Sequence, residues 1–390
     1  MDLQYTPEEQ AFRAEVRQWM AANVPTTPLP DFDSTRAGFE AHREWERTLH
    51  KGGWGMVTWP AEYGGRGLDL IRWLIFEEEY YRAGAPGRVN QNGIFLLGPT
   101  LIEYGTPEQK ARFLPAMAAG DDIWAQAWSE PGAGSDLAGV RATATRVKNA
   151  EGGDDYILSG HKIWSSRAVH ADWAFGLFRE PGSERHKGLS LILFPLNAPG
   201  VTVKPIQRLD GKPVFAELFL DDVRIPIANR LGDEGQGWAV CMSTAGFERG
   251  LMLRSPARFQ VAAAKLVELW KERGSDPLLG AEVMQAWMDA DAYALSIYAT
   301  ASRLMAGGAI GPETSTNKIF WSELDLDLHK TALSLLGAEA ELTAALPGAA
   351  APVADWLDGY VFSLAGPIYA GANEIQRNII AERMLGMPRE

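Results

Sequence analysis

The chain has 390 residues, of which 46% are hydrophobic and 22% charged, a composition typical of globular proteins with a large core. Its 37 Lys and Arg against 50 Asp and Glu give a formal charge of −13, which disfavours nonspecific binding to nucleic acid or to an anionic membrane. Cys241 is the only cysteine, so no internal disulfide forms, which suits a reducing compartment. The first residues lack the apolar run of a signal peptide, and no stretch is apolar enough to span a bilayer. We therefore expect a cytoplasmic protein.

The first third of the chain predicts helices. Thr6-Pro7-Glu8-Glu9 is a capping box with proline at the first helical position, and Thr106-Pro107-Glu108-Gln109 repeats the device. Between them a Gly-rich turn at 59–70 leads into an amphipathic stretch at 71–84. Two such caps indicate helices and say nothing of function.

The pattern changes after about residue 122, where short β-branched or aromatic runs alternate with Gly, Pro, Asn and Asp. These runs are 141–147, 172–178, 189–195, 201–206 and 213–220. Their spacing predicts a small antiparallel barrel or sandwich. From residue 235 the Ala- and Leu-rich segments 255–273 and 281–309 predict long helices packed as a bundle, with a loop or a local insertion at 345–356. The fold class is thus α+β, with domains at 1–122, 123–234 and 235–390.

Two short motifs carry candidate chemistry. In AWSEPGAGSDLAG (127–139), Gly132 and Gly134 can expose backbone N–H groups to a phosphate, and Ser135 adds a hydroxyl donor. The same residues also suit an ordinary turn between a helix and a strand. In GHKIWSS (160–166), Trp164 beside two hydroxyls could flank a planar heteroaromatic cofactor, or could be a core tryptophan. No metal site is predicted.

These two motifs occur in register with WPAEYGGRG (59–67), VKPIQRLDG (203–211), the stretch 219–238 and IYAGANEIQRNIIAERMLG (368–386). With all of them present, the chain resembles the acyl-CoA dehydrogenase family over essentially its whole length. The resemblance implies an N-terminal helical domain, a middle antiparallel β domain and a C-terminal four-helix bundle. It also implies FAD between the β domain and the bundle, an acyl-CoA substrate in lipid β-oxidation, a tetramer, and an electron-transferring flavoprotein as electron acceptor.

The resemblance assigns flavin contacts to three segments of the chain. Its cofactor-binding residues are Gln126, Ala127, Trp128, Ser129, Gly132, Gly134, Ser135, Trp164, Ser165, Ser166, Gly371, Ala372, Asn373 and Glu374. Many relatives carry an aromatic residue in place of Gln126. Many also carry Thr in place of Ser129 and Ser166, and serine keeps the hydrogen-bond donor. Ser135 is assigned to phosphate or substrate.

The family's chemistry removes an α-proton with a carboxylate while the β-hydrogen leaves as hydride to the flavin. Most relatives carry the glutamate where this chain has Ala370, whose backbone N–H would still polarise the thioester carbonyl. A minority carry it early in the C-terminal domain, where this chain has Glu248 followed by Arg249. We therefore predict Glu248 as the base and Arg249 as a substrate neighbour. The alternatives are a solvated helix carboxylate and a simple ion pair.

In homotetrameric relatives a neighbouring subunit contacts the adenosine end of FAD. Several of the residues that make those contacts are replaced in this chain. The Arg-x-x-Phe-Gly stretch is absent at 272–285, and Ser334 and Ala338 replace a glutamine and a glycine. The chain therefore resembles the catalytic subunit of an α2β2 heterotetramer acting on bulky steroid side-chain thioesters, while a homotetramer with altered contacts explains the same residues. Two further alternatives are a non-catalytic partner subunit and an oxygen-using flavoenzyme of this fold.

Overall fold

The computed structural model describes residues 4–249, 254–342 and 353–389, and the side chains of 248–249 and 353–354 lie outside the description. By internal packing the chain divides into two compact units. The first, here the helical unit, comprises residues 1–24, 69–85 and 249–390. The second, here the sheet unit, comprises 25–68 and 86–248. The domain limits drawn from the sequence remain predictions.

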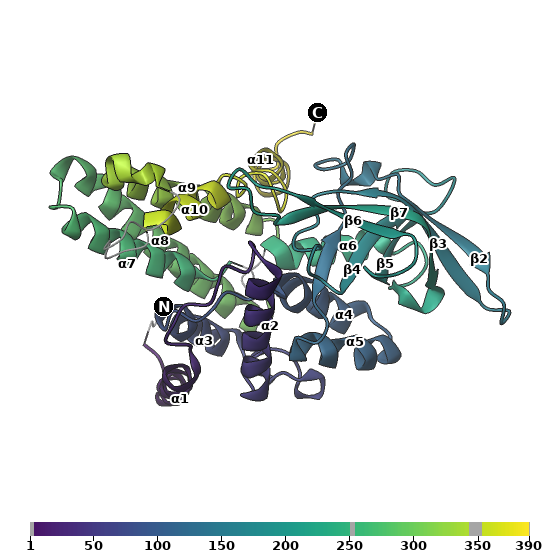
Figure 1. Ribbon diagram of the computed structural model, residues 1–390, viewed down its shortest axis with the longest axis horizontal. Helices are drawn as coiled ribbons and strands as arrows, with labels where there is room; N and C mark the ends of the chain where they lie inside the picture. The colour runs from purple at the N-terminus through teal and green to yellow at the C-terminus, as the bar shows by residue number, and fades with distance from the viewer. Residues whose placement is uncertain (1–3, 250–253, 343–352, 390) are drawn as a thin grey trace. The chain divides into compact units, whose positions relative to one another are not determined.

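The helical unit is built from long helices with apolar faces turned toward one another. Four of them, all in the C-terminal third, lie side by side (Figure 1): α7 (Pro256–Glu272), α8 (Pro277–Met305), α9 (Thr314–Leu336) and α10 (Val353–Ser363). The remaining elements of the unit are α1 (Pro7–Asn23), α3 (Leu70–Arg82), η5 (Gly337–Glu341), α11 (Asn373–Ile379) and η6 (Ile380–Met384). The capping box predicted at α1 is confirmed, since Thr6 and Glu9 exchange side-chain-to-backbone bonds of 2.8 and 3.2 Å.

The sheet unit contains one eight-stranded sheet, whose path runs β6-β7-β3-β2-β4-β5-β8, with β1 paired to β4. The strands are β1 (Trp124–Ala127), β2 (Thr143–Lys148), β3 (Asp154–Lys162), β4 (Trp173–Arg179), β5 (Leu189–Pro195), β6 (Val201–Ile206), β7 (Phe215–Pro226) and β8 (Arg230–Leu231). Most pairs are antiparallel, as predicted, but β1 and β2 each pair with β4 in parallel. The core of the unit takes buried residues from β1 to β5 and from β7, and β5 itself is buried along all but its last residue.

Among the described helices of the sheet unit, five precede β1 in the sequence and three follow it. They are α2 (Arg36–Lys51), η1 (Ala61–Tyr63), η2 (Asn92–Leu97), α4 (Gly98–Tyr104), α5 (Pro107–Ala119), η3 (Leu137–Gly139), η4 (Ile227–Asn229) and α6 (Gly237–Arg249). The second predicted capping box is confirmed at Thr106 and Gln109, the start of α5. Within the described residues no helix is long and apolar enough to cross a membrane.

One element boundary differs from the prediction. The loop expected at 345–356 falls largely outside the described residues, but α10 begins at Val353, so its last four residues are helical and that part of the prediction is wrong. In the sequence a proline directly precedes Val353, and proline is common where helices start.

Candidate functional site

The first predicted flavin segment follows β1 as a tight turn. Glu130 and Ala133 exchange two backbone hydrogen bonds of 3.0 Å, and this places Pro131 and Gly132 at the exposed tip. A Cβ added at Gly132 or Gly134 would meet no atom of the described chain within 4 Å. Open space therefore borders the backbone at both glycines, as an approaching phosphate would require.

The second segment follows β3. Trp164 adopts a left-handed backbone with φ of 61° and is 56% exposed, with its ring edge-on to Phe215 at 5.8 Å between centroids. Ser165 holds this conformation by pairing with Ala216 through two backbone bonds of 3.0 Å. A left-handed residue other than glycine costs about 1–2 kcal/mol, and such residues gather at functional sites. An exposed tryptophan held in this way is poorly explained as a core residue.

Several polar atoms of these segments have no partner in the described chain. The hydroxyls of Ser129, Ser135 and Ser166 make no side-chain hydrogen bond there, and the Oγ of Ser165 and Nε1 of Trp128 are buried without one. Buried polar groups are almost always satisfied, so the Oγ of Ser165 and the Nε1 of Trp128 point to a missing partner, while the three other hydroxyls are exposed or half-buried and open to a ligand. The other members of the segment, Gln126 and Ala127, lie in β1 beside Phe175 and Gly176 of β4.

Lys162 and Ile163, which sequence reasoning missed, connect the two segments through hydrogen bonds. Lys162, the last residue of β3, donates to the carboxylate of Glu130 at 2.7 Å and to the carbonyl of Trp128 at 3.2 Å. The N–H of Ile163 donates to the carbonyl of Ser129 at 2.9 Å. The signal available in the sequence was a lysine at an inward position of a strand, which is rare unless the charge is paired.

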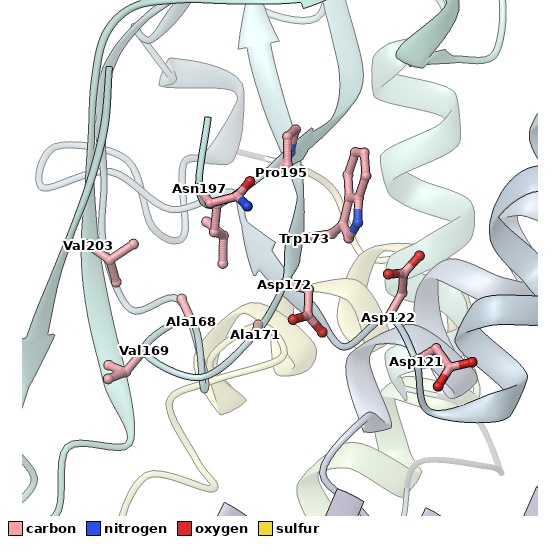
Figure 2. Close-up of a pocket in the computed structure, with 11 residues that line it drawn as sticks. Asp121, Asp122, Ala168, Val169, Ala171, Asp172, Trp173, Pro195, Asn197 and Val203 are labelled. Atoms are coloured by element: carbon pink, nitrogen blue, oxygen red, sulfur yellow. The ribbon is translucent and has the colours of Figure 1, made fainter. Parts of the chain in front are cut away.

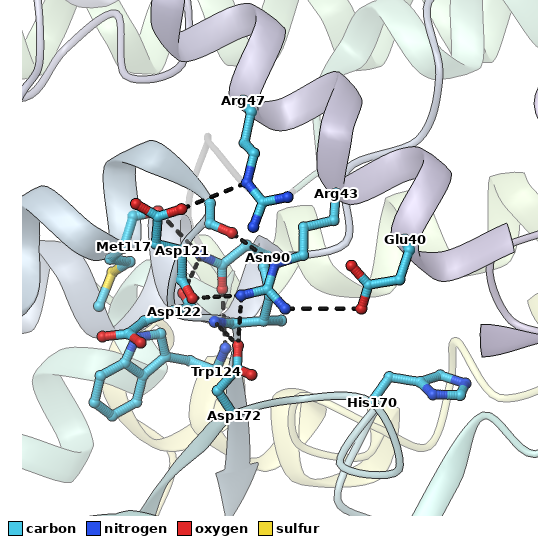
Figure 3. A network of polar contacts seen from close by, with 12 residues as sticks. Glu40, Arg43, Arg47, Asn90, Met117, Asp121, Asp122, Trp124, His170 and Asp172 are labelled. Carbon is cyan, nitrogen blue, oxygen red and sulfur yellow. Dashed lines mark hydrogen bonds and ion pairs between the residues drawn. The ribbon is translucent and has the colours of Figure 1, made fainter. Parts of the chain in front are cut away.

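The start of β1 is fixed by a polar network within the sheet unit (Figure 3). Asn90 donates to the carbonyls of Met117 and Asp122 at 3.2 and 3.0 Å and accepts from the N–H of Trp124 at 3.0 Å. Arg43 pairs with Asp172 at 3.0 Å and also donates to the carbonyl of Gly120 at 2.8 Å. These bonds set where the first flavin segment begins.

A cavity of about 460 Å³ lies beside this network and holds none of the predicted site residues. Figure 2 shows the carboxylates of Asp122 and Asp172 on one side and Val169 and Val203 on the other. Burial, followed by the charge of Asp172, raises the pKa of Asp122. Asp172 accepts from the N–H of Ile123 at 2.9 Å and pairs with Arg43, so it already serves to hold β1, and we assign the cavity no role in the candidate site.

The predicted base and its neighbour are the last two residues of α6. Their side chains, Glu248 and Arg249, lie outside the described residues, but the helix before them is well anchored. Thr244 meets Thr100 of α4 at 2.9 Å, and Ser243 donates to Glu103 of α4 at 2.8 Å. The backbone that carries the predicted base is therefore fixed within the sheet unit.

The third segment lies in the helical unit, where Ala370 has a φ of 56° and Gly371 a φ of 82°. Gln376 closes this bend by donating to the carbonyl of Gly371 at 3.1 Å. Asn373 is 2% exposed and accepts from the buried Lys318 at 2.6 Å, so its side chain anchors the bend from inside. Gly371, Ala372 and Glu374 remain exposed or half-buried.

The residues of the two sheet-unit segments fit a flavin. They offer open space at two glycines, three uncommitted hydroxyls and an exposed indole in a strained backbone. The third segment adds a second strained bend, and Trp164 and Ala370 are two of only six non-glycine residues with positive φ among the described residues.

Comparison with known proteins agrees with this arrangement. Models of the acyl-CoA dehydrogenase N-terminal, middle and C-terminal domains match residues 6–121, 125–223 and 235–385. The chain is 42% identical to acyl-CoA dehydrogenase IpdE1 of Mycolicibacterium smegmatis, over 98% of this chain and 99% of that protein. Among solved structures it is similar to the ChsE4-ChsE5 complex from Mycobacterium tuberculosis, with 31% identity, a TM-score of 0.86 and full coverage of both chains. It is also similar to the Tcur3481-Tcur3483 steroid ACAD, with 28% identity, a TM-score of 0.87 and full coverage of both chains.

The fold and the site thus define an oxidoreductase of acyl-CoA thioesters. The chain belongs to the acyl-CoA dehydrogenase family, and the fold class and the enzyme class predicted from the sequence are confirmed. The family implies a flavin cofactor.

Proposed function

We propose that this chain binds FAD and catalyses α,β-dehydrogenation of an acyl-CoA thioester, with Glu248 as the base. The observation that carries the proposal is the pair of substitutions at the two family positions, alanine at 370 and glutamate at 248, at the end of a helix anchored to α4. When bound, FAD accepts the β-hydrogen as hydride. Glu248 takes the α-proton, and the N–H of Ala370 stabilises negative charge on the thioester oxygen.

The phosphates of the substrate's CoA would meet a basic loop next to Ser135. Arg185 pairs with Asp136 at 2.9 Å, and His186 and Lys187 beside it are exposed. Arg179 stabilises the loop by donating to the carbonyls of Ala138 and Arg185 at 2.8 and 2.7 Å. The exposed cations of this loop, Arg185 and Lys187, support binding of a nucleotide thioester.

We further propose that the working enzyme is an α2β2 heterotetramer with a related subunit. Arg273 is held by a bidentate pair with Glu339 at 2.8 and 2.6 Å, and the hydroxyl of Ser334 donates to its own helix. In this proposal neither side chain remains to hold a neighbour's adenosine phosphates. The similar ChsE4-ChsE5 complex and the Tcur3481-Tcur3483 steroid ACAD each carry the names of two components, which supports the same assembly.

An apolar stripe on α8 supports association with another subunit. Four large side chains on one face of this helix are 39–53% exposed: Met284, Trp287, Met288 and Leu295. Contiguous exposed apolar surface of this kind marks interaction sites. A homotetramer remains the alternative, and mass measurement of the purified protein separates the two.

We propose a bulky, steroid-like acyl group as the substrate class, because one of the similar solved structures is a steroid ACAD. Electron-transferring flavoprotein would take the electrons, and the protein would act in the cytoplasm, where its single buried thiol, Cys241, stays reduced.

The test is an anaerobic titration of the purified protein with linear, branched and steroidal acyl-CoAs, followed at the flavin absorbance bands. Glu248→Gln should fail to bleach, while Glu268→Gln, which removes an exposed carboxylate of α7, should bleach like wild type. Bleaching by Glu248→Gln would overturn its role as base. In a separate aerobic assay, oxygen consumption during turnover would favour the oxygen-using alternative. A flavin-containing chain inert to every thioester would favour a non-catalytic subunit.

A further inference from the structure

A buried ion pair lies directly behind the two flavin segments of the sheet unit. Lys162 is 0% exposed and Glu130 is 9% exposed, and their charged atoms are 2.7 Å apart. The three ammonium protons of Lys162 have three partners, Glu130 and the carbonyls of Trp128 and Leu177 at 3.2 and 2.5 Å. The lysine is therefore fully committed inside the protein.

Glu130 is equally committed. Besides Lys162, its two carboxylate oxygens accept from the backbone N–H groups of Arg141 and Ala142 at 2.7 and 2.9 Å. Burial lowers the pKa of Lys162, while the charge of Glu130 acts in the opposite direction. Five hydrogen bonds thus converge on one pair of side chains that no step of the proposed reaction uses.

The partners of this pair lie on both flavin segments. Glu130 and Trp128 flank Ser129 in the first segment, and Lys162 immediately precedes Ile163 and Trp164 at the second. Together with the bond from Ile163 to the carbonyl of Ser129, three hydrogen bonds tie one segment to the other. A shift of either segment would break them.

The pair also sets the orientation of a peptide group. The C=O and N–H of a trans peptide point in opposite directions, so the bond from Lys162 to the carbonyl of Trp128 turns the N–H of Ser129 away from the lysine. The N–H is thereby presented on the side opposite the buried pair. A donor with a fixed direction is what recognition of a polar ring edge needs.

Stability alone explains the pair poorly. Replacing a buried ion pair by apolar groups of similar volume is often neutral or stabilising, because taking two charges out of water is costly. A buried ion pair fixes the positions of the segments that carry it, because only a narrow range of geometries is favourable. Removing one partner leaves the other charge buried without compensation.

We propose that Glu130 and Lys162 are positioning residues for the flavin, whose ion pair fixes the separation and orientation of segments 126–135 and 163–166. The proposal rests on the proposed function, in which both segments hold FAD.

The test uses the full chain, with any subunit that co-purifies, stripped of flavin. Glu130→Asp keeps the charge and withdraws the carboxylate by one methylene, and Lys162→Met removes the charge at similar length. The control is Asp155→Asn, which breaks an ion pair with Arg224 (3.0 Å) at the other end of the same strand, β3. Two quantities are measured, the Kd for FAD and hydrogen exchange of peptides covering 126–135 and 163–166 before flavin is added.

We expect Glu130→Asp and Lys162→Met to weaken FAD binding by about 10- to 100-fold and to speed exchange in both segments together. Asp155→Asn should leave the Kd within about twofold and exchange in these segments unchanged. Wild-type Kd and exchange in Glu130→Asp would overturn the proposal, and this variant decides alone if Lys162→Met does not fold. An equal effect of Asp155→Asn would also overturn it. A wild-type protein that takes up no FAD refutes the proposed function itself.

Discussion

The contact between Thr100 and Thr244 allows a direct test of how α6 is held. Both residues are fully buried, and their hydroxyl oxygens are 2.9 Å apart. Each hydroxyl also lies within hydrogen-bond distance of the carbonyl four residues earlier, Leu96 at 2.8 Å and Val240 at 2.9 Å. Two protons therefore serve three contacts, and at any moment either the bridge between the helices or one of the bonds within a helix lacks a proton.

The number of hydroxyl protons determines how much unfolding free energy a Thr→Val change removes. In Thr244→Val the remaining hydroxyl of Thr100 can still donate to the carbonyl of Leu96, so no buried donor is left unpaired. Valine matches the shape of threonine, so no cavity opens. The loss is then one net hydrogen bond, about 0.5–1.5 kcal/mol of unfolding free energy, rather than the larger penalty of an orphaned group.

The assay is a double-mutant cycle by urea unfolding on wild type, Thr100→Val, Thr244→Val and the double variant. Because wild type holds two of the three bonds at any moment, each single variant one and the double variant none, the two single costs should add to within about 0.5 kcal/mol. A double variant that costs about 1 kcal/mol less than the sum of the single variants would refute this proton count and show that all three contacts stabilise the protein at once. Turnover of Thr244→Val should fall, since α6 carries the proposed base.

Three further outcomes follow from the structure. If Glu248 is the base, adding Ala370→Glu to Glu248→Gln should restore part of the rate, to about tenfold above the matched double variant with Ala370→Gln. Position 370 already has a left-handed φ of 56°, so the new glutamate adds no backbone strain. Equal rates in the two double variants would contradict this. Burial lowers the pKa of His329 from 6.5, so the unfolded state binds more protons in mildly acidic solution and stability should fall as pH drops below about 6.5, a slope that His329→Asn should reduce in pH-dependent unfolding. Gly359→Ala should lower the midpoint of thermal unfolding, because the new Cβ would overlap the ring of His329. The overlap costs about 1–3 kcal/mol of unfolding free energy, and the better helix propensity of alanine returns about 1 kcal/mol. An unchanged midpoint would show that the ring moves aside.

Local signals predicted local structure well. The capping boxes at Thr6 and Thr106 specify their own helix starts within four residues, so no distant contact can easily override them. The runs at 189–195 and 201–206 match β5 and β6 to the residue, because a short apolar run or an alternating β-branched one suffices for a strand when turn residues bound it. The β3 strand was missed as an element, since the motif at 160–166 drew the interpretation toward a cofactor contact.

What the sequence could not predict depends on partners far away in the chain. Nothing near Asn90 indicates that its amide would hold the carbonyls of Met117 and Asp122, and nothing near Arg43 indicates Asp172. The parallel pairing of β1 with β4 likewise follows from the long connection between them, which alternation does not encode. These distant bonds fix where β1 starts, and with it the first flavin segment.

The same reasoning explains why a resemblance of motifs was a better guide to function than any single residue. Gly132, Trp164 and Ala370 each have an ordinary interpretation alone, as a turn glycine, a core tryptophan and a loop alanine. The structure removes that interpretation for Trp164, which is 56% exposed in a strained backbone, whereas Gly132 does lie at the exposed tip of a turn. Ala370 adopts a left-handed φ of 56°, which is costly for a residue other than glycine. A backbone kept in a costly conformation without its side chain is expected when the backbone N–H itself has the function, and this is the role proposed for Ala370.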